Sequence, residues 1–120
     1  MGKYTEEEFY SMDFTFFFKK ENTVMEIASN GSMHEKFLEL DKESQDKLFE
    51  YFSDLKNTSK WLMNAEAPAY PDASSFTGWA EKGVYAYDID GDDEVLVAMP
   101  KTHLTVDSLP LEIRKLLTEF

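Results

Sequence analysis

The stretch that decides the fold is FTFFFKKENTVMEIAS, residues 14–29. Its first part, Phe14–Lys20, places aromatic side chains at adjacent positions around a β-branched threonine, which is typical of a strand covered on both faces. Glu21-Asn22 then predicts a turn, and Thr23–Ser29 predicts a second strand. These two strands are the start of a sheet, and the remaining chain is expected to supply its other strands and the helices that cover it.

The segments on either side of this stretch carry start signals for further elements. Upstream, Thr5-Glu6-Glu7-Glu8 matches a capping box and predicts a short helix to about Ser11. Downstream, Asn30-Gly31 is a strong two-residue hairpin signal, which predicts a third strand over residues 33–40. Ser32-Met33-His34-Glu35 also matches a capping box, so a helix beginning at Ser32 is the alternative.

The clearest helix follows, with Asp41 as its expected N-cap and an end near Lys56. At 100° per residue one face of this helix is apolar and the opposite face is acidic. The apolar residues are Leu48, Phe49, Phe52 and Leu55, and the acidic residues are Glu43, Asp46, Glu50 and Asp54. The apolar stripe is expected to pack on the sheet, and the acidic stripe is expected to face water.

The C-terminal half begins with a long connection over residues 57–82, in which Trp61-Leu62-Met63 either extends the helix or forms a turn. A short helix after Asp72 is one possibility. Gly83–Ile89 and Val95–Met99 predict two strands joined at Asp90-Gly91, a second hairpin signal. A tight turn there would place Asp88 opposite Asp93.

A last helix is expected to begin at Asp107 or Ser108. The element order β-β-β-α, long connection, β-β-α predicts a single α+β domain over residues 1–120. The expected architecture is an antiparallel sheet of about five strands with helices packed on one face.

Composition excludes several classes of protein. The 120 residues include 24 Asp and Glu, 12 Lys and Arg and no cysteine, which gives a net charge of −12. A disulfide scaffold and a thiolate metal site are excluded, and no apolar run approaches the ~18 residues of a membrane span. The acidic N-terminus lacks an apolar signal region, so we expect a cytoplasmic protein. The charge disfavours direct nucleic-acid binding and favours a cationic partner.

No motif indicates catalysis. His34 and His103 start no metal-binding pattern, and neither a Gly-x-Ser-x-Gly elbow nor a glycine-rich phosphate loop occurs. The run Asp88–Glu94 resembles a calcium loop, but its glycine is fourth where an EF-hand needs it sixth, which favours a hairpin turn. We therefore expect no catalytic residue, cofactor or metal.

Charge distribution is the most informative feature. Residues 61–94 hold eight acidic side chains and one basic one, interleaved with aromatic rings. Acidic groups beside aromatic anchors are what an interface to a basic protein needs. The residues expected to bind such a partner are Glu66, Tyr70, Asp72, Phe76, Trp79, Asp88, Asp90, Asp92, Asp93 and Glu94. The alternative is a solvated acidic segment whose rings lie in the core.

In its size, charge, lack of cysteine and α+β layout the chain resembles the bacterial immunity proteins, small acidic partners that neutralise a toxic nuclease or other effector. Gly83–Asp88, Met99-Pro100 and Leu109–Leu117 also resemble segments of small bacterial domains. The resemblance implies a cytoplasmic inhibitor of a basic protein, without catalysis of its own.

Three other functions are kept as alternatives. One is a DNA mimic whose carboxylates imitate phosphates. Another is a ligand-binding or enzymatic domain with a pocket between the sheet and residues 61–82, in which His34 or His103 would exchange protons. The third is an assembly component that uses the aromatic strand Phe14–Phe18 as an interface.

Overall fold

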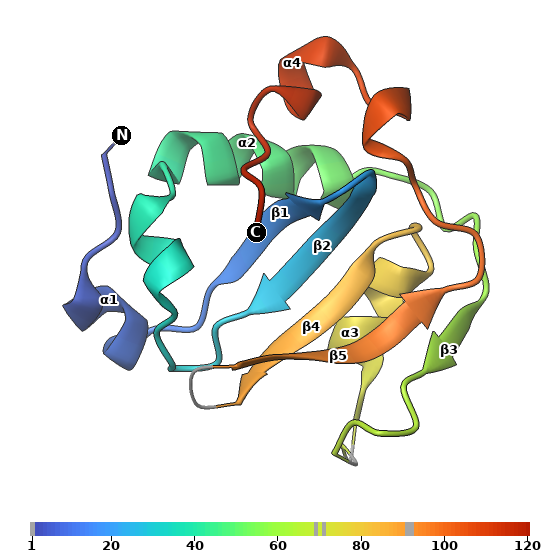
Figure 1. Ribbon diagram of the computed structural model, residues 1–120, viewed down its shortest axis with the longest axis horizontal. Coiled ribbons are helices and arrows are strands. Elements are labelled where there is room, and N and C mark those ends of the chain that lie inside the picture. Colours follow the sequence, from blue (N-terminus) through green and yellow to red (C-terminus); the bar gives the residue numbers. More distant parts are fainter. Residues whose placement is uncertain (1, 69, 71, 91–92) are drawn as a thin grey trace.

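The computed structural model describes residues 2–68, 70, 72–90 and 93–120 (Figure 1). The α-helices are α1 (Glu6–Ser11), α2 (Lys42–Ser53), α3 (Ser74–Ala80) and α4 (Leu111–Arg114), and the 3₁₀ helices are η1 (Glu35–Glu39) and η2 (Val106–Ser108). The strands are β1 (Thr15–Lys20), β2 (Thr23–Ala28), β3 (Trp61–Met63), β4 (Tyr85–Asp90) and β5 (Asp93–Pro100). They form one five-stranded sheet in the order β1-β2-β4-β5-β3.

The sheet is mixed, which confirms the α+β class and corrects the expectation of a purely antiparallel sheet. β1 and β2 are antiparallel, as are β4 and β5, and β5 and β3. β2 and β4 are parallel, with Ala28 beside Asp88. The long segment between β2 and β4 includes α2 and α3, so it is long enough to bring β4 back beside β2 in the same direction.

The predicted third strand over residues 33–40 is wrong. Asn30 and Gly31 do take the positive φ angles of a tight turn, 48° and 75°. The chain then leaves the sheet, and His34 Nδ1 accepts a hydrogen bond from the Lys36 N–H at 3.1 Å to begin η1. The edge of β2 that a hairpin would have used is occupied by β4, and Phe37 is buried in the core instead.

Helices pack on both faces of the sheet around β1, not on one face as expected. Phe16, Phe17 and Phe18 are all fully buried, as the aromatic pattern predicted. Because successive side chains of a strand point to opposite faces, such a run requires cover on both sides. Phe17 packs among residues of α2 and α3, and Phe16 and Phe18 pack among residues from α1 and η1. In Figure 1, α3 lies behind β4 and β5.

Two further expectations are corrected. Trp61–Met63 neither extends α2 nor forms a turn, but pairs with the end of β5 as strand β3. In the β4–β5 hairpin, Asp90 lies opposite Asp93 and Asp88 lies opposite Val95, so Asp88 does not face Asp93 as predicted. Gly91 of the proposed Asp90-Gly91 turn lies outside the described residues.

The predicted C-terminal helix is divided into two short pieces, η2 and α4. Leu109 and Leu117 from this region are buried against the face of the sheet that α2 covers. None of the helices in the described residues is long and apolar enough to cross a lipid bilayer.

Candidate acidic binding site

A hollow of about 310 Å³ lies where β1 begins and β4 ends. Its apolar lining comes from Phe14, Ala28 and Phe76, and its carboxylates come from Asp13 and Asp88. The other lining residues are Thr15, Asn30, Tyr70 and Ser75. The lining therefore combines an apolar surface with two acidic side chains and includes no lysine or arginine among the described residues.

Asp88 is the more buried of the two acids of this hollow. It is 8 % exposed, and its two carboxylate oxygens accept different hydrogen bonds. The Tyr70 hydroxyl donates to Oδ2 at 2.8 Å, and the Ile89 N–H donates to Oδ1 at 2.9 Å. Burial and the bond to Asp88 raise the pKa of Tyr70 to about 12, so Tyr70 stays protonated at neutral pH and holds the carboxylate in place.

Glu26 lies deeper on the same face of the sheet. It pairs with Ala86, two residues before Asp88 on β4, and is 2 % exposed. Among the described residues, its Oε1 finds no hydrogen-bond partner. Burial, with a smaller contribution from the charge of Asp88, raises the pKa of Glu26 well above its ordinary value. The neutral form is favoured there, so the charge of this region is provided by Asp13 and Asp88.

A second hollow, of about 480 Å³, adjoins the first and shares Asp13, Phe14 and Thr15 with it. It adds the carboxylates of Glu8 and Asp46 and the partly exposed ring of Phe49. The remaining lining residues are Tyr4, Lys42 and Gln45. Lys42 is the one basic residue in this lining, and its Nζ lies 3.0 Å from Glu8 Oε2. Asp13 therefore stands between two hollows that each carry acidic and aromatic groups.

This arrangement suits the side chain of a lysine or arginine. The aliphatic stem of such a side chain can lie on an aromatic ring while its charged head reaches a carboxylate. In the first hollow the ring would be Phe14 and the carboxylates Asp13 and Asp88. No three histidine, aspartate or glutamate side chains of the described residues form a group that could hold a metal ion.

The structure brings together Tyr70, Phe76 and Asp88 from the residues predicted to bind a partner. Phe76 is only 7 % exposed and can offer a partner little more than one edge. Trp79 packs on Phe17, with ring centroids 5.2 Å apart, and belongs to the core cluster there.

The other predicted residues lie outside the first hollow. Glu66, Asp72, Asp90 and Asp93 are exposed, and Glu94 is partly buried. Asp72 accepts a hydrogen bond from the Ser74 N–H at 2.9 Å, which lowers the pKa of Asp72 and helps to start α3. Asp92 lies outside the described residues.

Sequence reasoning missed Asp13 and Asp46 as parts of the site. Asp13 directly precedes the aromatic strand, and Asp46 belongs to the acidic stripe of the helix that was expected to face water. Neither position stands out from the many other acids of the chain, and only the folded structure places them beside the same hollow.

The two histidines line neither hollow. His34 begins η1, and the His103 ring lies 6.0 Å from the ring of Tyr85. The pair therefore contributes no acid–base group to this site.

Comparisons of the chain with protein-family models, curated proteins and solved structures found no match.

Proposed function

We propose that this chain is an acidic binding protein that inhibits a basic partner protein by receiving its lysine or arginine side chains in the two adjoining hollows. The observation that carries the proposal is the position of Asp13 between them, with Asp88 on one side and Asp46 on the other. A partner with two neighbouring cationic side chains could occupy both hollows at once.

The energetics favour such a partner over a small ligand. One exposed ion pair contributes only about 0.2–1 kcal/mol, so affinity requires several of them together with apolar contact. Phe14 and Phe49 offer that contact beside the carboxylates. The net charge of −12 adds a long-range attraction that accelerates encounter with a basic protein.

An immunity-type function follows naturally from this binding mode. A nuclease grips the phosphates of its substrate with lysine and arginine side chains. A protein that takes up those side chains would compete with the nucleic acid and stop cleavage. The expected partner is therefore a toxic nuclease or a similar basic effector, and the chain itself needs no catalytic group.

The test is capture of partners from a lysate of the source cell with three immobilised proteins. These are the wild type, the double variant Asp13→Asn with Asp88→Asn, and the control Asp107→Asn with Glu112→Gln. The control also removes two negative charges, but from exposed positions in η2 and α4. Binding that depends on the hollows is expected to retain a basic protein on the wild type and on the control, and to lose it from the hollow variant.

A basic protein held equally well by all three proteins would refute the proposed site, and recovery of no basic protein would refute the proposed function. A captured nuclease is expected to stop cutting nucleic acid when one equivalent of the wild type is added. Addition of excess duplex DNA should displace the wild type from it, because the two compete for the same cations.

A further inference from the structure

Glu26 stands one strand pair further in than the lining of the first hollow. Side chains alternate along β2, so Val24, Glu26 and Ala28 share the face that α2 and α3 cover. Ala28 and its β4 neighbour Asp88 both line the hollow. Glu26 belongs to the next pair on the same face, opposite Ala86 and about 6–7 Å along the strands. A buried carboxyl therefore lies directly behind the carboxylate of Asp88.

The Glu26 carboxyl is buried without the partner that burial normally requires. The residue is 2 % exposed, and its Oε1 finds no hydrogen-bond partner among the described residues. Its neighbours on the adjoining strands are Phe17 and Ala86, whose side chains are apolar. Buried polar atoms in native proteins are almost always paired, so an unpaired one calls for an explanation.

The charges that face Glu26 come from few residues. Asp88 lies on the same face of β4, and Asp13 lies at the far side of the hollow. Lys19 shares this face of β1, two residues beyond Phe17 and away from the hollow. The helix α3 contains no titratable residue. The buried residues of α2 are uncharged as well, namely Gln45, Leu48 and Phe52. On the side of the hollow, Glu26 therefore faces negative charge alone among the described residues.

We propose that a cationic side chain bound at Asp88 makes Glu26 release its proton and act as a second carboxylate of the site. The inference rests on the proposed function, because the cation is the lysine or arginine that a basic partner places in the first hollow. The O–H bond of Glu26 breaks, its proton passes to water, and the electron pair stays on the carboxylate oxygen. The new negative charge then attracts the bound cation.

Two effects of the cation act on Glu26 in the same direction. In the empty hollow, burial and the negative charge of Asp88 both raise the pKa of Glu26. A cation held by Asp88 neutralises that charge. A positive charge within about 4–6 Å also favours the ionised form of a carboxyl directly. Both effects are larger at a buried group than at the surface, because water screens them less.

Proton release makes the affinity depend on pH. The pKa of Glu26 is higher in the free protein than in the complex, so binding releases a proton at pH values between the two. Within that range the association constant rises with pH, by up to about tenfold per pH unit for one proton. Acidification should therefore weaken the hold of this protein on its basic partner.

Carboxyl ¹³C chemical shifts observe the proton of Glu26 directly. The protein is labelled at the side-chain carboxyl of glutamate, and the signal of Glu26 is identified by its absence from the variant Glu26→Gln. At pH 7 the free protein should show this signal at the position of a protonated carboxyl. Saturation with a short peptide that carries two neighbouring arginines should move it towards the ionised position. The same peptide with citrulline at both positions should leave it unchanged.

Calorimetric titration of the arginine peptide between pH 5.5 and pH 8 tests the consequence for affinity. The ratio of the wild-type association constant to that of Glu26→Gln should increase with pH, by up to about tenfold per pH unit. Both proteins contain every other titratable group, so the ratio isolates the contribution of Glu26.

Three results would overturn the proton release and leave the proposed function standing. They are a Glu26 carboxyl already ionised in the free protein at pH 7, one that stays protonated while the peptide shifts the amides of residues 13–15, and a ratio independent of pH. A peptide that shifts no amide of the hollow would refute this inference and the proposed function together.

Discussion

Glu26 occupies an unusual position for a carboxyl group, beside Phe17 on one neighbouring strand and Ala86 on the other. Burial raises its pKa, so the folded protein holds a proton that the unfolded chain releases once the pH exceeds the ordinary glutamate value of about 4.3. The folded state binds more protons above that pH, and stability must therefore fall as pH rises towards the folded pKa.

Glu26→Gln removes this titration while keeping the size of the side chain. The variant is expected to be more stable than the wild type at pH 7, and the gain should disappear near pH 4. Between these limits the wild type should lose up to about 1.4 kcal/mol per pH unit relative to the variant. Urea unfolding at several pH values measures this difference, and a gain independent of pH would contradict the buried neutral carboxyl.

Gly83 is required by backbone conformation and by space. Its φ is +92°, and an added Cβ would lie 2.9 Å from the backbone nitrogen of Leu104. Gly83→Ala is therefore expected to lower the free energy of unfolding by roughly 2 kcal/mol or more. Gly78→Ala is the matched control, because Gly78 lies within α3 and nothing would meet its Cβ within 4 Å. That substitution should raise stability by up to about 1 kcal/mol.

At the scale of elements, α2 covers one face of the sheet and also binds the free edge of β1. Gln45 is 3 % exposed and bonds to both backbone groups of Phe17 on the edge of β1. Gln45→Leu keeps the volume of the side chain but leaves the buried N–H and carbonyl of Phe17 without hydrogen-bond partners. Stability should fall by about 2–4 kcal/mol.

Lys47→Ala on the same helix serves as the control, because it removes only the exposed pair with Glu43 and should cost less than about 0.5 kcal/mol. Equal losses in thermal unfolding of the two variants would refute the edge-closing role of Gln45.

Local signals located most elements, and pairing over long distances decided the rest. The capping box Thr5–Glu8 and the N-cap Asp41 begin helices as predicted, since each depends on residues within one turn. Asn30-Gly31 forms its turn, but the return strand fails because β4, from far along the chain, occupies that edge of β2. Trp61–Met63 is too short to show a periodicity, so only its pairing with β5 identifies it as a strand.

The candidate site was likewise predictable only where its residues lie in one segment of the sequence. The acidic segment 61–94 drew attention to Tyr70 and Asp88, which the structure joins by a hydrogen bond. Asp13 and Asp46 come from two other segments, and no local pattern connects them with Asp88. Their meeting depends on how α1, α2 and the start of β1 pack together, which composition and periodicity do not encode.

At the scale of the whole molecule, the charge of −12 attracts a basic partner over a long range. Salt shortens the screening length from about 30 Å at 0.01 M to about 10 Å at 0.1 M. The association rate with a basic partner should fall severalfold over this range, because attraction is screened. Stopped-flow mixing at several salt concentrations measures this rate, and an association rate independent of salt would contradict the long-range attraction.

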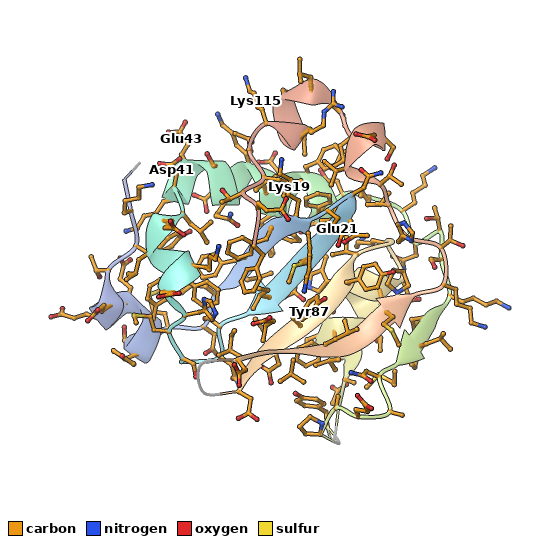
Figure 2. All side chains as sticks on the ribbon, viewed as in Figure 1. Lys19, Glu21, Asp41, Glu43, Tyr87 and Lys115 are labelled. Atoms are coloured by element: carbon orange, nitrogen blue, oxygen red, sulfur yellow. The ribbon has the colours of Figure 1, made fainter. Side chains whose placement is uncertain are left out.

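The face of β4 and β5 turned towards the viewer in Figure 1 carries no helix, and Tyr87 stands on it (Figure 2). Tyr87 is half-buried, and burial raises its pKa. This open face lies on the side of the sheet opposite Asp88, since side chains alternate along β4. Its side chains therefore point away from the acidic hollows.

The central claim is that the hollows around Asp13 receive cationic side chains, and amide chemical shifts of ¹⁵N-labelled protein test it most directly. The probe is a short peptide with two neighbouring arginines, and its control carries citrulline at both positions, which keeps the shape and removes the charge. The account predicts shifts concentrated at residues 13–15, Tyr70 and Asp88 with the arginine peptide, weak shifts with citrulline, and little change in α4, which lines neither hollow. Shifts spread over all acidic surfaces, or equal shifts with both peptides, would contradict it.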